Sequence, residues 1–226
     1  DDFVLIPANP VASIEDNLSE KEKTFYQMLG VYLGDGGARK TGKIRGIILS
    51  MSKESEMGIL QKFAERVALD YDRITHKNCP ATVLIAPTSG RYGITNTQLI
   101  NKFAEMVDLT KYSYEKCLSD RIFGLSLGEQ RYVLQGLFTS DGTVANYGEK
   151  SQYVALDSTS LQLIKDVQVL LLGFGIKSKI YMNRRAGKTR AILPDGKGGL
   201  KEYDVREVHS LRISRSGRVK FEKLIG

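Results

Sequence analysis

Apolar and polar positions along this chain follow two alternating periods, and the whole alternation occurs twice. Apolar residues three and four apart are typical of helices that face a core, whereas apolar residues at every second position are typical of strands. The helices that this pattern predicts span 19–34, 54–69, 96–108, 127–140, 159–172 and 215–225. The strand-like segments form hairpins over 38–51 and 143–157 and lie around 72–78, 82–86, 176–183 and 202–213. The pattern therefore predicts an α+β fold of two α-β-β-α-β-β-α half-units, with residues 186–200 as an exposed loop.

This alternation divides the chain into four parts. Residues 1–18 form an N-terminal segment that has no counterpart later in the sequence. A first half-unit spans 19–109, a linker spans 110–125, and a second half-unit spans 126–226. Two similar units in one chain indicate an ancient duplication.

Matched motifs support the duplication. Residues 28–36 and 134–142 are both apolar helical runs that end in an acidic residue and a glycine, at Asp35-Gly36 and Asp141-Gly142. Each run is preceded by a capping box, Ser19 to Glu22 and Ser126 to Glu129. The small residues four apart in each run are Gly30 and Gly34, and Gly136 and Ser140.

Small residues at this spacing leave a smooth helix face on which a second backbone can lie closely. If the two helices pack through these faces, Asp35 and Asp141 meet at their electronegative C-terminal ends. Two adjacent carboxylates repel each other unless a cation lies between them. The motifs therefore predict a site for a divalent cation.

The positive charge of the chain favours a polyanionic partner. The net charge is +7, and no acidic residue occurs between Asp166 and Asp195. Residues 175–182 alternate like a strand, so Lys177 and Lys179 would share one face, as in a basic ribbon that contacts DNA. A solvated strand edge guarded by lysines is the alternative. The basic residues of the interval are Lys177, Lys179, Arg184, Arg185, Lys188 and Arg190.

The remaining composition excludes other classes. No apolar run is long enough to span a bilayer, and no secretory signal opens the sequence. The two cysteines, Cys79 and Cys117, lack zinc-site spacing and are too few for a disulfide framework. We therefore expect a cytoplasmic, reducing location. His76 and His209 lack metal-ligand spacing and are interpreted as structural or surface residues.

The two motifs resemble those of a known family. Leu29-Gly30-Val31-Tyr32-Leu33-Gly34-Asp35-Gly36 and Leu134-Gln135-Gly136-Leu137-Phe138-Thr139-Ser140-Asp141-Gly142 are similar to the paired motifs of the LAGLIDADG homing endonucleases. The stretch from Ser158 to Ile176 is also typical of that family, and the resemblance covers 19–226. The opening residues 2–7 resemble a splicing-domain strand that leads into the endonuclease part of an intein.

This resemblance implies a fold and an activity. It implies a monomer with a pseudo-twofold axis between the motif helices and two saddle-shaped antiparallel sheets that straddle double-stranded DNA. Asp35 and Asp141 would bind Mg²⁺ or another divalent cation, and the carbonyls of Gly34 and Ser140 would add ligands. The reaction would be phosphodiester hydrolysis that breaks both strands. The DNA contacts expected are Arg39, Lys40, Lys43, Arg45, Lys77, Arg91, Tyr92, Tyr147, Lys150, Gln152 and the basic residues of 177–190.

A lysine completes the implied site. Lys116 occupies the place before the second motif where family members of the intein type carry a catalytic lysine. Its counterpart, at the offset that aligns Phe103 with Phe221, falls near position 234, beyond Gly226, so the two strands are expected to be cut unequally. Lys220 or Lys223 is an alternative second lysine.

Two rival interpretations use the same residues. A nucleic-acid-binding relative that does not cut, such as a transcription regulator or maturase, keeps the fold without the chemistry. A phosphate-binding loop at Gly34-x-Gly36-Gly37 is disfavoured because no lysine follows at the Walker position and the glycines close a helix.

Overall fold

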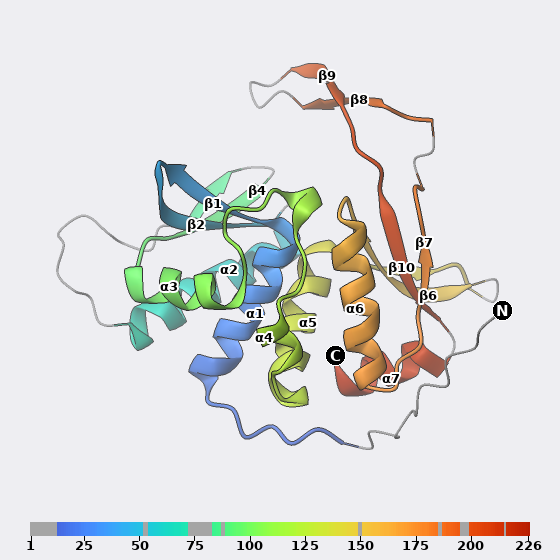
Figure 1. Ribbon diagram of the computed structural model, residues 1–226, viewed down its shortest axis with the longest axis horizontal. Coiled ribbons are helices and arrows are strands. Elements are labelled where there is room, and N and C mark those ends of the chain that lie inside the picture. Colours follow the sequence, from blue (N-terminus) through green and yellow to red (C-terminus); the bar gives the residue numbers. More distant parts are fainter. Residues whose placement is uncertain are drawn as a thin grey trace.

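Two four-stranded antiparallel sheets lie on either side of a central helix pair in the computed structural model (Figure 1). The structure describes residues 13–51, 54–71, 83–86, 89–148, 151–184, 187–194, 199–214 and 216–226. The first half-unit contains α1 (Glu20–Asp35), β1 (Gly36–Thr41), β2 (Lys43–Met51), α2 (Glu54–Asp70), β3 (Val83–Ala86), β4 (Ser89–Ile94) and α3 (Thr97–Met106). The linker contains η1 (Ser113–Glu115) and α4 (Asp120–Phe123). The second half-unit contains α5 (Leu127–Asp141), β5 (Gly142–Asn146), β6 (Gln152–Ser158), α6 (Leu161–Gly173), β7 (Lys179–Tyr181), β8 (Arg190–Pro194), β9 (Leu200–Asp204), β10 (His209–Ser214) and α7 (Ser216–Leu224).

The two sheets have the same topology, as the duplication predicts. Their strand orders are β1-β2-β4-β3 and β5-β6-β10-β7, so β10 takes the place of β4 and β7 that of β3. The predicted α+β class and the doubled α-β-β-α-β-β-α order are confirmed. The strand expected around 72–78 lies outside the described residues, and β4 lies where the pattern predicted no strand. One addition breaks the equivalence: β8 and β9 are inserted between β7 and β10.

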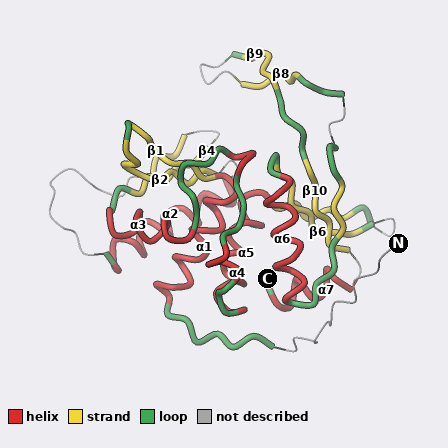
Figure 2. Tube along the Cα trace, viewed as in Figure 1, coloured by secondary structure: helices red, strands yellow, loops and turns green. Residues whose placement is uncertain are grey.

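This addition corrects the loop expected over 186–200. Residues 190–194 pair with 200–204 as an antiparallel ribbon, from Arg190 opposite Asp204 to Pro194 opposite Leu200. The ribbon projects away from the rest of the molecule (Figure 2). The sequence of this stretch, rich in glycine and lysine, did not indicate strands. A ribbon that is exposed on both faces needs no alternation of apolar residues, and that alternation is the signal used to predict strands.

The motif helices begin and end as the sequence predicts. Ser19 and Ser126 each accept a bond from the backbone at the third helical position, and Glu22 and Glu129 complete both capping boxes. At the other end, Gly36 is extended, with φ −100° and ψ 162°, so α1 runs directly into β1. A Cβ on Gly36 would lie 2.4 Å from the Cα of Tyr32, so only glycine fits this sharp exit.

The two motif helices touch through their backbones. A Cβ built on Gly30 would lie 2.0 Å from the carbonyl oxygen of Val133, and one on Gly136 would lie 2.0 Å from that of Gln27. The two glycines are 106 positions apart in the sequence, and so are the two residues that they face, so a pseudo-twofold operation relates the two contacts. The close packing predicted from the small residues is present.

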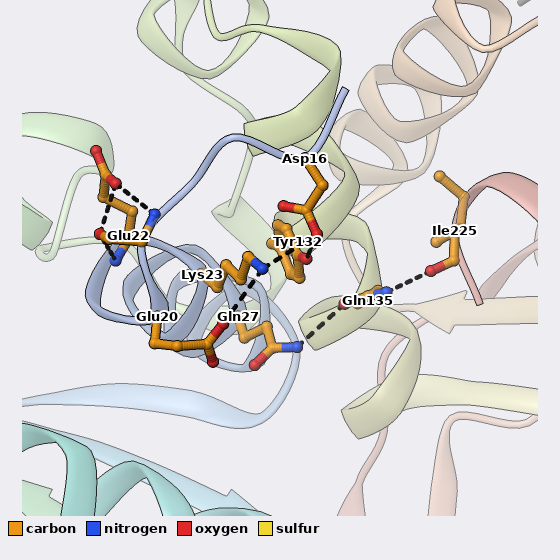
Figure 3. Close-up of polar contacts among 9 residues, drawn as sticks. Asp16, Glu20, Glu22, Lys23, Gln27, Tyr132, Gln135 and Ile225 are labelled. Atoms are coloured by element: carbon orange, nitrogen blue, oxygen red, sulfur yellow. Dashed lines mark hydrogen bonds and ion pairs between the residues drawn. The ribbon is translucent and has the colours of Figure 1, made fainter. Parts of the chain in front are cut away.

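Polar side chains join the N-terminal parts of these helices, away from Asp35 and Asp141. Lys23 pairs with Asp16 at 3.1 Å, and the hydroxyl of Tyr132 donates to the same carboxyl at 2.8 Å (Figure 3). The amide of Gln27 donates to the side-chain oxygen of Gln135 at 3.0 Å. These bonds fix the register of one helix against the other.

Each sheet buries one face against helices and leaves the other open. In the first sheet Ile47 and Leu49 are 0% exposed, and Ile44 is partly buried. In the second sheet Leu156 and Leu211 pair with each other and are both 0% exposed. The outward residues of the strands therefore face away from the core.

Candidate functional site

Asp35 and Asp141 are the last residues of α1 and α5, so the crossing of these helices brings them together. At this end, a Cβ on Gly34 would lie 2.1 Å from Oγ of Ser140 and 3.0 Å from Oδ2 of Asp141. At position 34, α1 thus places no side chain of its own between the two half-units. Glycine at position 34 allows the carboxyl of the second motif to lie against the first.

The electrostatics of the pair depend on this proximity. Burial, and then the negative charge of Asp35, raise the pKa of Asp141 to about 7. Lys116 opposes this rise, and the exposed carboxyl of Asp157 adds to it. A carboxyl whose ionisation is disfavoured in this way gains most from a nearby cation.

Lys116 lies against the end of α1. Its Nζ donates to the backbone oxygens of Tyr32 at 2.6 Å, Gly36 at 2.9 Å and Gly34 at 3.1 Å. The side chain therefore caps the electronegative end of the first motif helix. Burial lowers the pKa of Lys116 to about 8, although the charges of Asp141 and Asp35 act in the opposite direction.

The donor set fits a divalent cation. Carboxylate and carbonyl oxygens are the ligands that Mg²⁺ and Ca²⁺ prefer, and Asp35, Asp141 and the carbonyls of Gly34 and Ser140 are the predicted donors of this kind. The Gly34 carbonyl already accepts from Lys116 and has a second lone pair. The described residues contain no cluster of three or more His, Cys, Asp or Glu with metal-site geometry. The remaining ligands of a cation here would be water or substrate oxygens, as is usual for Mg²⁺.

Three predicted arginines are exposed on or beside the open face of the first sheet. Arg91 pairs with Ser50, and Arg39 pairs with Gly46, so both point away from buried Ile47 and Leu49. Arg45 is exposed at the register shift between β1 and β2, and Lys43 follows the hairpin turn.

Lys40 has a different environment from its neighbours. Its Nζ donates to the carbonyl of Thr110 at 2.6 Å and lies 5.5 Å from the ring centre of Tyr112. Tyr112 stacks on Tyr114 at 5.8 Å, and the guanidinium of Arg206 covers Tyr114 at 3.5 Å. Lys40 therefore binds the linker in this structure, and the linker is joined by these rings to the second half-unit.

The prediction for Tyr92 is wrong. It was expected to contact DNA beside Arg91, but it is 0% exposed and packs in the core. Adjacent residues of a strand point to opposite faces, so Arg91 and Tyr92 cannot both be outward. The alternation from Tyr92 to Ile94 already contained this information.

The open face of the second sheet contains a residue that the sequence analysis missed. Arg212 lies opposite Ala155 and Lys179, and its guanidinium is held between the rings of Tyr153 and Tyr181, at 4.7 and 4.8 Å. Alternation with buried Leu211 and Ile213 was the signal that would have found it. The predicted contacts that are exposed in this half-unit are Tyr147, Gln152, Lys177, Lys179, Arg184, Lys188 and Arg190.

Arg190 is charge-paired within the ribbon. It lies 3.1 Å from Glu202 and 3.3 Å from Asp204, both on β9. Arg190 belongs to a sequence interval that lacks acidic residues, but the fold places acidic residues beside it. The predicted contacts Lys77, Lys150 and Arg185, with His76 and residues 2–7, lie outside the described residues. His209 is structural, as expected: it is 6% exposed and its Nδ1 accepts from the amide of Asn183.

The alternative second lysines do not act on Asp141. Lys220 donates to the carbonyl of Gly175 at 3.1 Å, and Lys223 is exposed on α7. Among the described residues, Lys116 is the cation whose charge affects the pKa of Asp141. The site is thus asymmetric.

The linker shows the same asymmetry. The side-chain amide of Gln130, on α5, donates to the carbonyls of Ile122, Phe123 and Leu125, which holds the linker along the second half-unit. The corresponding side of the first half-unit, where Thr24 stands at the position of Gln130, is an open groove of about 340 Å³. It is lined by residues of α1, α2 and α5 that include Gln27, Phe63 and Thr139.

The raised pKa of Asp141 leads to a stability prediction for the metal-free protein. We expect Asp141→Asn to be more stable than the parent at pH 8 by about 1–3 kcal/mol. The folded-state pKa of about 7 exceeds the unfolded value of 3.8, so the stability cost of the carboxyl appears as the pH rises above about 4 and is complete above pH 7. That cost declines as the pH falls from 7 towards 4, and the variant's advantage should be smaller at pH 5 than at pH 8.

Thermal unfolding in EDTA at pH 8 and pH 5 measures this difference. Asp157→Asn, which removes an exposed carboxyl of the same site, is the control and should change stability little. An equal advantage of Asp141→Asn at both pH values would contradict the electrostatic explanation.

Comparison with known proteins places the fold. Residues 128–226 match the LAGLIDADG-like domain family. The chain resembles mesophilic variants of the homing endonuclease I-DmoI, with a TM-score of 0.59 and 17% identity over 92% of both chains. It also resembles I-DmoI in complex with DNA and Ca (TM-score 0.58, 15% identity, 92% and 91% coverage) and the N-terminal LAGLIDADG domain of DUF199/WhiA (0.54, 12%, 93% and 87%).

Curated relatives match shorter parts. The chain is 38% identical over 106 residues, 46% of its length, to subunit alpha of the ribonucleoside-diphosphate reductase NrdEB of Bacillus subtilis (strain 168). It is 34% identical over 84 residues, 37% of its length, to the ribonucleoside-diphosphate reductase large subunit of Invertebrate iridescent virus 6. It is 28% identical over 100 residues, 39% of its length, to a DNA gyrase subunit of Mycobacterium kansasii. These matches cover 10%, 8% and 18% of the relatives, so the chain corresponds to a small part of each. No described helix is long and apolar enough to cross a membrane.

Proposed function

We propose that this chain, whose residues 128–226 match the LAGLIDADG-like domain family and whose fold resembles that of I-DmoI, is a site-specific endonuclease that breaks both strands of DNA by Mg²⁺-dependent hydrolysis. The observation that carries the proposal is the pair of motif carboxyls, Asp35 and Asp141, held together beside Lys116. A protein that only bound DNA would gain nothing from two repelling carboxylates at its centre. We further propose that one chain, acting as a monomer inside the cell, supplies both half-sites.

The residues have separable roles in this mechanism. Asp35 and Asp141 would hold a divalent cation, and its charge would favour ionisation of a bound water and offset negative charge on the oxygens of the scissile phosphodiester. Lys116 places positive charge where negative charge develops on the phosphate. The outward arginines of the first sheet bind the DNA on one side of the site, and Arg212 of the second sheet binds it on the other side. Guanidinium groups suit this role because they bond phosphates and guanine through two N–H groups at once.

The relatives support an origin within an intein. About 100 residues of this chain match parts of a ribonucleotide reductase and of a DNA gyrase, two differently named proteins. A segment that is a small share of two unrelated hosts is what a mobile insert would look like. We propose that the chain is the endonuclease part of such an insert, and that its target is the host coding sequence that the insert interrupts.

A cleavage assay tests the proposal. Purified protein is incubated with a plasmid that contains a host sequence rejoined across the insert, with Mg²⁺ or with EDTA, and a randomised DNA library serves if that sequence is not cut. Linear product that requires Mg²⁺ supports an endonuclease. Specific binding without cutting would support the second candidate, a nucleic-acid-binding protein that does not cut, which the similarity to the WhiA domain favours.

Salt dependence tests the DNA surface. We expect affinity to fall steeply as salt rises, because basic side chains release counterions from phosphates. Replacing Lys177, Lys179 and Arg184 together with glutamine should lower the slope of log K against log salt by about 0.9 for each phosphate that the variant no longer neutralises. Fluorescence anisotropy with a labelled duplex at several salt concentrations measures the slope.

The control removes the same charge from helices. Lys62, Lys165 and Lys223 are exposed on α2, α6 and α7, so glutamine at all three should leave the slope within about half a unit of the parent. Equal slopes for the two triple variants would remove residues 177–184 from the DNA surface.

The position of Lys116 beside the site predicts unequal strand chemistry. We expect Lys116→Ala to raise the barrier for one strand by about 3 kcal/mol, the cost of losing one preorganised donor, and to accumulate nicked plasmid. Conversion of supercoiled plasmid through nicked to linear DNA gives both rates. Cutting of both strands at parental rates would show that Lys116 only caps α1.

A further inference from the structure

Residues 116–118 connect the two half-units at the candidate site. The side chain of Lys116 binds the end of α1, in the first half-unit. The backbone on either side of Cys117 is bonded instead to α6, in the second half-unit. The lysine is therefore held from two directions by two different parts of the duplication.

Two side chains make the backbone bonds. Oγ of Ser160 donates to the carbonyl of Lys116 at 2.6 Å, and the amide of Leu118 donates to Oδ2 of Asp166 at 2.9 Å. Both bonds are buried, so water does not compete for them. A peptide segment bonded on both sides of one residue can neither rotate nor shift along α6.

The two anchors are themselves fixed. Ser160 is 1% exposed and is the N-cap of α6, where its Oγ accepts from the amide of Leu163 at 3.2 Å. Asp166 is 9% exposed, and its second oxygen accepts from the side-chain amide of Gln162 at 2.7 Å. Each anchor therefore has its rotamer set by a second bond, which is the condition for precise placement of a reactive group.

We infer that Ser160 and Asp166 are positioning residues that set Lys116 from the second half-unit. This inference rests on the proposed function, because it takes Lys116 to act in the cleavage of DNA. Docking of α6 then determines where the ammonium of Lys116 lies at the end of α1. The lysine is in place only when both half-units are packed together, so the chemistry at this centre depends on the whole fold.

Thiol labelling tests the anchoring without DNA. Cys117 is a free thiol of intermediate exposure between the two anchored groups, and Cys79→Ser leaves it as the single thiol. We expect Ser160→Ala to raise the labelling rate of Cys117 about tenfold, because the segment then opens locally more often. Ser160→Thr, which keeps the hydroxyl, should label at the parental rate. Ser126→Ala removes an N-cap hydroxyl of α5 that does not bond the linker, and it is the matched control.

Strand-resolved cutting tests the positioning. A duplex target with a different dye on each strand gives two rates, and Lys116→Ala identifies the strand that depends on the lysine. Ser160→Ala and Asp166→Asn should slow that strand about 10- to 100-fold, the expected cost of a shift of about 1 Å, while DNA affinity and the other strand stay near parental values. Ser160→Ala should add nothing in a Lys116→Ala background.

The outcomes separate the inference from the proposed function. If Lys116→Ala slows one strand but Ser160→Ala does not slow the same strand, the positioning role is wrong and the endonuclease proposal stands. If Ser160→Ala speeds labelling no more than Ser126→Ala does, the anchoring is wrong. If no variant cuts any DNA but labelling rises as expected, the anchor is structural and the proposed function has failed.

Discussion

Asp35→Asn and Asp141→Asn are each expected to abolish double-strand cleavage, with a loss of at least about 10³-fold in rate, while DNA affinity changes by less than about threefold. The affinity should survive because the outward arginines and lysines of the sheets, and not the carboxyls, contact phosphates. The rate should not survive because a neutral amide binds Mg²⁺ too weakly to hold it in the site.

Parallel binding and cutting assays on one labelled duplex measure both quantities, with Ca²⁺ in the binding assay to prevent turnover. Asp157→Asn is the control, since its exposed carboxyl only adds charge to Asp141 and should remain active. If either motif variant cuts at the parental rate, the assignment of two acids to the cation is wrong. If either loses binding in step with cutting, the carboxyls act on DNA affinity and not on chemistry.

Gly30→Ala and Gly136→Ala are each expected to destabilise the protein by about 3 kcal/mol or more, and the leucine variants by more. The added methyl group would lie 2.0 Å from a backbone carbonyl oxygen of the facing helix. Backbone cannot rotate away as a side chain can, so α1 and α5 must separate. Separation also moves Asp35 from Asp141, and cleavage should fall with stability.

Chemical denaturation at fixed pH measures the loss. Gly58→Ala, in α2, is the control: nothing lies within 4 Å of the added methyl, and removing a helical glycine should stabilise by about 0.5–1 kcal/mol. The same change of residue thus has opposite expected signs at two helical positions. Unaltered stability of both motif variants would mean that the helices do not pack through these glycines.

Much of the architecture could be predicted from the sequence. The two capping boxes, the small residues four apart and the terminal acid-glycine pairs are local signals, and each acts within a few residues of its position. They determined where α1 and α5 begin and end and which face they present to each other. The duplication then gave the order of strands, because two copies of one pattern fold in one way. The candidate acids and Lys116 followed from the same motifs and from the resemblance that they carry.

The residues on the outward faces of the sheets were predicted only in part. Arg39 and Arg91 could be placed by alternation, but Tyr92 was placed on the wrong face when strand period was not applied to its neighbour. Arg212 was missed although Leu211 and Ile213 flank it. These are errors of interpretation, since the period of 2 that decides them is in the sequence.

Other features belong to the tertiary structure alone. The charge of Arg190 is balanced by Glu202 and Asp204, 12 and 14 positions later, through strand pairing that the glycine- and lysine-rich stretch did not indicate. Lys40 binds the carbonyl of Thr110 instead of remaining free, and Lys116 is held at α1 by Ser160 and Asp166.

The reason is physical. Periodicity, capping and small-residue spacing report interactions between residues close along the chain, so a sequence by itself determined the helices, the hairpins and the faces that must be buried. The pKa of Asp141 and the neutralisation of Arg190 depend on burial and on charges that approach through space. Those distances exist only after the two half-units have packed, and only the tertiary structure decides them.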